Sequence, residues 1–184
     1  MARTASTMLP LGRPIPTFAL PEPATGRTIA SPPPGTPTLV LFICNHCPYV
    51  VHIRSRLVEV AHAALDAGVC VIAINANSVA THPEDGPEAM ATLAQREQWR
   101  FPFLFDASQE VARAFGAACT PDLFLFGPNG LFYRGQFDDA RPGSPVPVTG
   151  GDLQAAIEAL TAGLDAPADQ WPSLGCNIKW HPDA

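Results

Sequence analysis

The apolar residues of the chain form continuous runs that alternate with segments of helical spacing. Runs at 38–43, 69–75 and 103–105 predict buried strands. Apolar positions spaced by three and four predict helices over 50–65 and 87–99, and a shorter helix from the cap Ser108 to Phe115. Gly68 is expected to end the first helix. Strands that alternate with helices in this order imply parallel strands joined by right-handed crossovers.

The second half of the chain predicts a hairpin and a closing helix. Apolar segments at 123–126 and 131–135 flank Pro128-Asn129-Gly130, a turn that favours antiparallel pairing. Asp152 is expected to cap a last helix that ends near residue 164. Prolines confine residues 11–20 to an extended edge segment, with a turn at 25–27 and a short strand at 28–30. We therefore expect one α/β domain with an extended cover at 1–37, a core at 38–164 and a tail without periodicity at 165–184.

Composition and charge narrow the class of protein. The 184 residues are 47% hydrophobic and 15% charged, which is typical of a folded globular chain. The net charge of −6 and the absence of any Lys/Arg run argue against a nucleic-acid partner. Residues 1–12 lack the apolar segment of a secretory signal, and no stretch is long enough to cross a bilayer. A cytoplasmic protein without a membrane partner is expected, and five cysteines suit a reducing compartment better than a disulfide framework.

The candidate chemistry lies where the first predicted strand meets the first helix, in the sequence Cys44-Asn45-His46-Cys47-Pro48. We expect both cysteines on the first turn of that helix, where unpaired amides and the helix dipole stabilise a thiolate. Cys44 should then have a lowered pKa, and a protonated His46 would lower it further. Stabilising the reduced form makes the disulfide a stronger oxidant, so Asn45-His46 should shift the pair to the oxidising side.

Structural and metal-binding roles are the alternatives for this pair. Zinc sites usually need a second CxxC or a closely spaced pair of histidines, and His52 and His62 lie ten residues apart. The segment His82-Pro83-Glu84-Asp85 could suggest a metal, but a mobile surface loop is the preferred interpretation. Cys70, inside the second strand, is expected to be a buried structural thiol.

The CxxC motif followed by Thr120-Pro121 before a hairpin resembles the thioredoxin superfamily over about residues 11–164. Within it, the stretch from Leu11 to Leu20 resembles the branch that includes peroxiredoxins, and the chain is similar to AhpC/TSA-like proteins. The resemblance implies a three-layer fold with a mixed central sheet, Cys44 as the attacking thiol and Cys47 as the resolving thiol. It also implies a cis peptide at Thr120-Pro121 that presents the Thr120 backbone to an extended substrate.

The chain departs from that pattern in three places. Ile43 and Asn45-His46 stand where thioredoxin has tryptophan and Gly-Pro, and the strand before the motif carries no acid. Asp122, Asp138 and Asp139 are candidates for deprotonating Cys47, with ordinary surface positions as the alternative. Peroxiredoxins place a threonine three residues before the peroxidatic cysteine, and Cys44 occupies that place relative to Cys47.

Two further cysteines leave alternatives open. Cys119 should lie close to the CxxC as a third redox thiol, a metal ligand or, preferably, a buried small residue. Cys176 could resolve a sulfenic acid on Cys47 or cross-link two chains, although an inert tail thiol is preferred.

The preferred function is a thiol-disulfide oxidoreductase that exchanges its Cys44-Cys47 pair with a protein or low-molecular-weight thiol partner. The supporting residues would be Asn45, His46, Cys119, Thr120 and Pro121. A thiol peroxidase acting on a hydroperoxide and a non-enzymatic metal-binding module of Cys44, His46, Cys47 and Cys119 are the alternatives. The preferred function requires neither a cofactor nor a metal.

Overall fold

A five-stranded mixed sheet forms the centre of the computed structural model, which describes residues 3–182. The first three strands in spatial order are parallel, and the last two form an antiparallel hairpin, as the sequence predicts. In that order they are β6 (Phe103–Phe105), β5 (Cys70–Asn75), β4 (Thr38–Phe42), β8 (Asp122–Gly127) and β9 (Gly130–Gly135).

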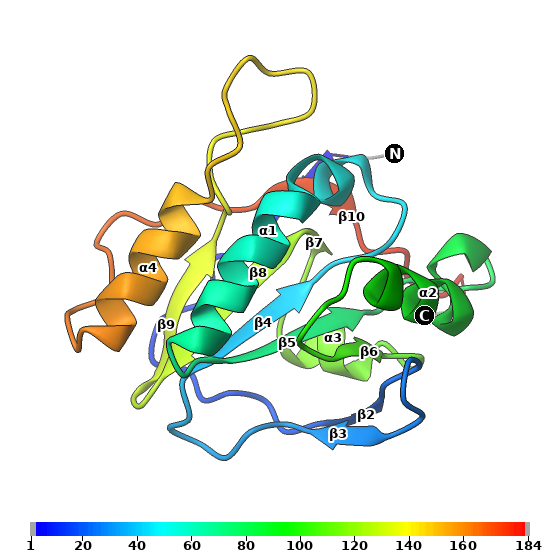
Figure 1. Ribbon diagram of the computed structural model, residues 1–184, viewed down its shortest axis with the longest axis horizontal. Helices are drawn as coiled ribbons and strands as arrows, with labels where there is room; N and C mark the ends of the chain where they lie inside the picture. Colours follow the sequence, from blue (N-terminus) through cyan, green and yellow to red (C-terminus); the bar gives the residue numbers. More distant parts are fainter. Residues whose placement is uncertain (1–2, 183–184) are drawn as a thin grey trace.

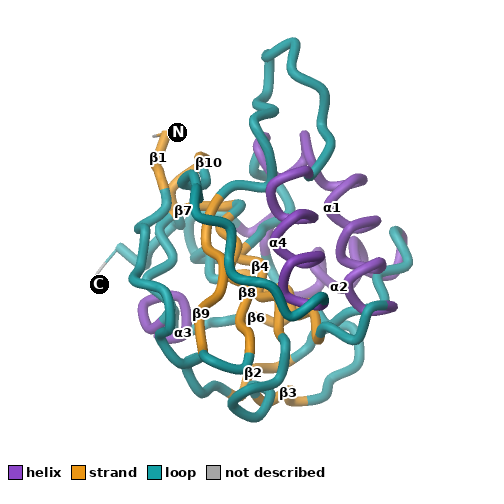
Figure 2. The backbone as a smooth tube through the Cα atoms, turned by 90° about the vertical axis from the view of Figure 1, so that its left-hand side faces the viewer, coloured by secondary structure: helices purple, strands orange, loops and turns teal. Residues whose placement is uncertain are grey.

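Helices cover both faces of this sheet and make the fold three layers deep (Figures 1 and 2). Three helices, α1 (Pro48–Asp66), α2 (Pro87–Arg96) and α4 (Gly151–Thr161), pack on one face. The short helix α3 (Glu110–Ala114) lies on the other face. All five residues of the central strand β4 are buried because side chains on each of its faces meet a covering layer. The predicted α/β three-layer class is thereby confirmed.

The two faces of β4 lead into two separate apolar cores. Leu39 and Leu41 pack toward α1, α2 and α4, whereas Val40 and Phe42 pack toward α3. On the α3 side, Phe42 and Phe115 are in edge-to-face contact with ring centroids 5.3 Å apart. Such aromatic pairs add about 0.5–1.5 kcal/mol beyond the area that they bury. The strand that leads to the CxxC motif is therefore held firmly from both sides.

The N-terminal segment completes the α3 side. β2 (Ala19–Pro21) and β3 (Thr28–Ala30) form a short antiparallel hairpin, and β3 has the residues predicted for a short strand. Phe18 and Leu20 are buried against the core on that side, and the hairpin lies along the lower edge of the molecule in Figure 1. The hairpin and the residue before it thus cover part of the α3 side of the core.

The two ends of the chain meet in a second sheet that the sequence does not predict. β1 (Arg3–Ala5), β10 (Leu174–Asn177) and β7 (Cys119–Thr120) are antiparallel neighbours in that order. The sequence of β10, Leu-Gly-Cys-Asn, is too short and too mixed to show an alternation. The tail is therefore anchored between β1 and the strand β7 that carries Thr120 (Figure 1).

The helix boundaries differ from expectation in a way that affects the chemistry. α1 begins at Pro48 with Cys47 as its N-cap, so Cys44 lies in the loop before the helix and not on its first turn. α2 ends at Arg96, and α4 is capped by Gly150, whose φ of +72° suits glycine, and not by Asp152. Within residues 3–182, no helix combines the length and the apolar character that a bilayer crossing requires.

Candidate functional site

The two cysteines of the CxxC motif lie at the junction of β4 and α1, below the molecular surface. Cys44 is 1% exposed and Cys47 is 0% exposed, and both are reduced in this structure. Cys47 is held at the start of the helix because its carbonyl accepts the first helical hydrogen bond, from the Val51 N–H at 2.9 Å. The sequence predicts the motif at a helix start, but only Cys47 has that position.

Cys47 is surrounded by hydrogen-bond donors. The Cys44 thiol has the largest effect on the pKa of Cys47, and the Thr120 side chain, the Val50 N–H and the Cys176 thiol also lower that pKa. Burial acts in the opposite direction and raises it. Together they lower the pKa of Cys47 to about 4. When Cys47 is protonated, its thiol donates to the Thr120 carbonyl oxygen at 3.1 Å. Both protonation states therefore have partners, and the helix N-terminus favours the thiolate.

Cys44 has the opposite environment. Its proton is held by the hydrogen bond to Cys47, and burial and the negative charge of Asp85 add to this, so the pKa of Cys44 is raised well above its ordinary value. Its Sγ lies 3.5 Å from Thr120 Oγ1 and 4.0 Å from His46 Nδ1. The expected lowering of the Cys44 pKa is therefore wrong in this structure, because the helix begins after Cys47 and a carboxylate lies next to Cys44.

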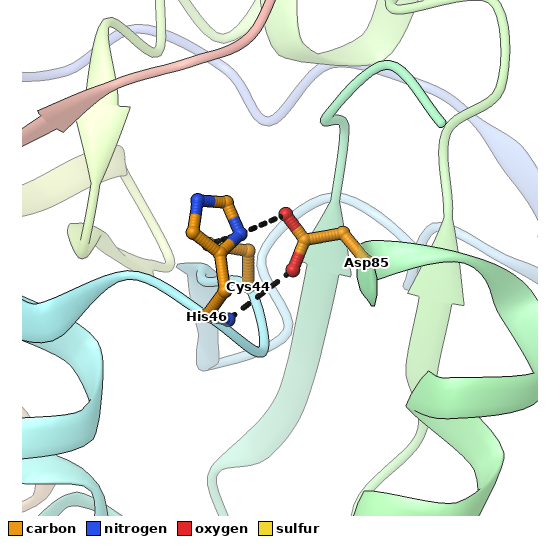
Figure 3. A group of neighbouring side chains, drawn as sticks. All are labelled: Cys44, His46 and Asp85. Carbon is orange, nitrogen blue, oxygen red and sulfur yellow. Dashed lines mark hydrogen bonds and ion pairs between the residues drawn. The ribbon is translucent and has the colours of Figure 1, made fainter. Parts of the chain in front are cut away.

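Asp85 holds the CxxC loop in place (Figure 3). It comes from the single 3₁₀ turn Pro83–Asp85 and is 0% exposed. Its Oδ1 accepts the backbone N–H groups of Asn45 at 2.9 Å and His46 at 3.3 Å. Its Oδ2 accepts His46 Nδ1–H at 2.6 Å and an Asn77 amide N–H at 2.8 Å. The expectation of a mobile surface loop at 82–85 is wrong for Asp85, because these four donors compensate the burial of its charge.

Two groups of side chains in this region have metal-ligand chemistry. The donor atoms of Cys44, His46 and Asp85 lie within 4.8 Å of one another, and so do those of His46, His82 and Glu84. Hydrogen bonds already account for both oxygens of Asp85 in the first group. Among the described residues, neither group includes Cys47 or Cys119, so the predicted ligand set for a metal-binding module is not brought together.

Thr120 lies between the two sulfurs of the motif. Its hydroxyl is near Cys44, its carbonyl is near Cys47, and the Thr120-Pro121 peptide is cis, as the resemblance implies. The neighbouring Cys119 is 0% exposed and its thiol donates to the Pro121 carbonyl at 3.4 Å. Burial is the main reason that the pKa of Cys119 is raised. The prediction of a buried small residue at 119 is confirmed.

Cys176 is a residue of the site whose place the sequence does not reveal. It lies on β10 directly opposite Thr120, is 3% exposed, and packs in the same apolar cluster as Cys44 and Cys47. Its thiol is hydrogen-bonded to Cys47, and burial, followed by that bond, raises the pKa of Cys176 to about 12. The preferred interpretation was an inert tail thiol, and strand pairing brings this tail to the CxxC motif. Cys70 was expected to be buried, and that expectation is wrong because the residue is only half-buried.

Of the three candidate acids, Asp122 is the most deeply buried. It is 0% exposed, its Oδ2 accepts the Ala118 N–H at 3.1 Å, and its Oδ1 has no partner among residues 3–182. Burial raises the pKa of Asp122 to about 7. Asp138 is committed to backbone amides before α4, and Asp139 is exposed. The surface-acid alternative therefore holds only for Asp139.

Comparisons with known proteins place this fold and motif in a family. An uncharacterised conserved protein from Geobacillus kaustophilus is 43% identical, with a TM-score of 0.96 and coverage of 100% of this chain and 99% of that chain. A hypothetical protein from Sinorhizobium meliloti 1021 is also 43% identical, with a TM-score of 0.92 and coverage of 97% and 99%. A putative thioredoxin from Neisseria meningitidis, 22% identical, covers 83% of this chain and 93% of its own, and its TM-score of 0.62 supports a thioredoxin-like fold.

A search of curated proteins finds no match to the chain. The family model described as AhpC/TSA, however, matches residues 11–133, a span that contains most of the N-terminal cover, the CxxC motif and the first strand of the hairpin. The chain belongs to the AhpC/TSA family.

Proposed function

We propose that the chain is a thiol-disulfide oxidoreductase whose working pair is Cys44 and Cys47. The AhpC/TSA family membership supports a redox role in general. The observation that carries the specific proposal is the place of the two sulfurs on either side of Thr120: Cys44 Sγ lies 3.5 Å from the Thr120 hydroxyl and Cys47 Sγ lies 3.1 Å from the Thr120 carbonyl oxygen. The lowered pKa of Cys47, about 4, and the raised pKa of Cys44 supply one thiolate and one thiol near neutral pH, which dithiol exchange requires.

The charge distribution favours Cys47 as the first nucleophile, the reverse of the order that the thioredoxin resemblance implies. The Cys47 thiolate attacks one sulfur of a partner disulfide, and the other partner sulfur leaves as a thiolate. Cys44 then loses its proton and attacks Cys47 in the mixed disulfide, which forms the Cys44-Cys47 disulfide and releases the second partner thiolate. Two electrons pass to the partner disulfide, and the Cys44 proton passes to one of the two released thiolates.

Substrate access is part of this proposal, because both sulfurs are buried. Asn45 and His46, the two middle residues of the motif, are hydrogen-bonded to Asp85, and the His46 side chain is 16% exposed. A cleft of about 830 Å³ begins beside Asn45 and runs between α1 and α2. We propose that the partner approaches along this cleft and that the motif loop shifts to expose a sulfur. Protein or low-molecular-weight thiols remain the proposed partners, and a cytoplasmic location stays a prediction.

The test is the behaviour of single cysteine variants toward oxidised glutathione and iodoacetamide. The wild-type chain should form an intramolecular Cys44-Cys47 disulfide, and Cys47→Ser should abolish exchange. In limiting iodoacetamide at about pH 6, Cys47 should be alkylated ahead of Cys44, because a thiolate and not a thiol is the nucleophile. Preferential labelling of Cys44 would restore the thioredoxin order, and a wild-type chain that forms no Cys44-Cys47 disulfide would refute the function.

A thiol peroxidase is the second candidate, favoured by the acidic Cys47 followed by Pro48 at the helix start. The Cys47 thiolate would attack the terminal oxygen of a hydroperoxide, release the alcohol or water, and become a sulfenic acid. Condensation with the Cys44 thiol would release water and form the same disulfide. Peroxide consumption at a rate well above that of a free cysteine, lost in Cys47→Ser, would favour this candidate. Consumption at the free-cysteine rate would exclude it.

A further inference from the structure

We infer that Cys176 is a third redox thiol of this site, which takes over the disulfide from Cys44 by exchange at Cys47. This inference rests on the proposed dithiol function, and it extends that function to a residue near the opposite end of the chain. The disulfide would move from the CxxC motif to a link between α1 and the C-terminal strand β10.

Strand pairing supplies the geometry. β10 pairs antiparallel with β7 so that Cys176 faces Thr120 and Asn177 faces Cys119. The Thr120 carbonyl is also the group that lies 3.1 Å from Cys47 Sγ. Residue 176 and residue 47 therefore meet at the same backbone group, and both side chains are buried in the same apolar cluster.

Gly175 permits this close approach. A Cβ at position 175 would lie 2.1 Å from the Thr120 carbonyl oxygen, a distance that no side chain could occupy. Any other residue would push β10 away from β7 and carry Cys176 away from Cys47. The tail thus occupies the edge of β7 in the way that an added peptide strand would, with a thiol at the redox sulfur.

The direction of exchange follows from the charges around Cys176. In the reduced site, the hydrogen bond to Cys47 and the charge of Cys47 help to raise the Cys176 pKa, after burial, and Lys179 opposes them. Oxidation of Cys47 to a disulfide removes its negative charge and therefore removes both of these effects. Burial, the largest cause of the raised Cys176 pKa, remains, but Cys176 loses its proton more easily once the pair is oxidised, when a disulfide is available to attack.

The step is an isomerisation and needs no external oxidant. Cys176 loses its proton and attacks the Cys47 sulfur of the Cys44-Cys47 disulfide. The Cys47-Cys176 bond forms as the Cys44-Cys47 bond breaks, and Cys44 leaves as a thiolate that takes up the proton. A partner then finds Cys44 reduced and the oxidising equivalent stored beside the tail.

Cys44→Ser isolates this step, because within the CxxC motif oxidised glutathione can then act only through Cys47. The glutathione adduct at Cys47 should be resolved by Cys176, releasing about two equivalents of glutathione per chain and leaving a Cys47-Cys176 disulfide in peptide mass spectra. Cys44→Ser/Cys176→Ser should stop at the adduct and release about one equivalent. Cys44→Ser/Cys119→Ser is the matched control and should release about two, since the Cys119 thiol is bonded to the Pro121 carbonyl.

Two results would overturn the inference. One is a Cys44→Ser chain that keeps the adduct at Cys47 while Cys176 remains open to alkylation in the denatured protein. The other needs no variant: disulfide mapping of the oxidised wild-type chain at equilibrium finds a Cys44-Cys47 disulfide but no Cys47-Cys176 disulfide. In both cases the Cys44-Cys47 disulfide of the wild type still supports the proposed function, whereas its absence would refute that function separately.

Discussion

Replacing Asp122 with asparagine should change how the stability of the protein depends on pH. Asp122 begins β8, directly after the cis peptide, and pairs across the sheet with Phe42 at the end of β4. Its side chain is 0% exposed, with one oxygen bonded to the Ala118 N–H and the other without a partner within residues 3–182. The neutral acid is therefore strongly favoured in the folded state.

The magnitude follows from the pKa, which burial raises from an ordinary 3.8 to about 7. At about 1.4 kcal/mol per pKa unit, this difference is worth about 4 kcal/mol. Because the folded state holds the proton more tightly, stability is highest below about pH 4 and falls as the pH rises toward 7. About 3 kcal/mol of that loss lies between about pH 5 and pH 8. An asparagine cannot ionise, so Asp122→Asn lacks this loss.

Denaturant unfolding of the wild type and of Asp122→Asn at about pH 5 and pH 8 measures the difference. Whatever the amide itself costs, the variant should gain about 3 kcal/mol relative to the wild type between the two pH values. Asp139→Asn is the matched control, since Asp139 is an exposed acid of the neighbouring loop, and it should show no such gain. A difference between wild type and Asp122→Asn that stays constant over this range would refute the account of a buried, neutral carboxyl.

Three other variants test the site. The thiolate absorbance of the reduced protein should persist down to about pH 5 and decline only near pH 4, and Cys47→Ser should remove this absorbance. If the absorbance persists in Cys47→Ser, the thiolate belongs to another cysteine. Asp85→Asn should lower the free energy of unfolding by about 2 to 4 kcal/mol, because charged hydrogen bonds to the motif loop are lost. An unfolding midpoint equal to that of the wild type would contradict this expectation. Gly175→Ala should displace β10 from Thr120 and speed the alkylation of Cys176, and unchanged alkylation would show that β10 is not held by that contact.

The central sheet could be read from the sequence because its signals are local. Runs of apolar residues mark β4, β5 and β6, and Pro128-Asn129-Gly130 marks the hairpin between β8 and β9. These patterns arise from burial on both faces and from turn chemistry, which act within a few residues. The helix ends were less accurate: a shift of a few residues at the start of α1 separates Cys44 from the helix and moves the expected charge to Cys47.

The sequence by itself determined the fold class, the CxxC pair at a strand-to-helix junction and the Thr120-Pro121 turn that lies against it. Only the tertiary structure decided what surrounds the pair. Asp85 reaches the motif from a 3₁₀ turn, and Cys176 reaches it from the C-terminal strand. Contacts between residues so far apart in the chain leave no periodic signal, because they are set by how the layers and strands pack against one another. The pKa values of the two cysteines depend on these distant partners, so the chemistry could be assigned to the pair from the sequence, but the charge could be placed only in three dimensions.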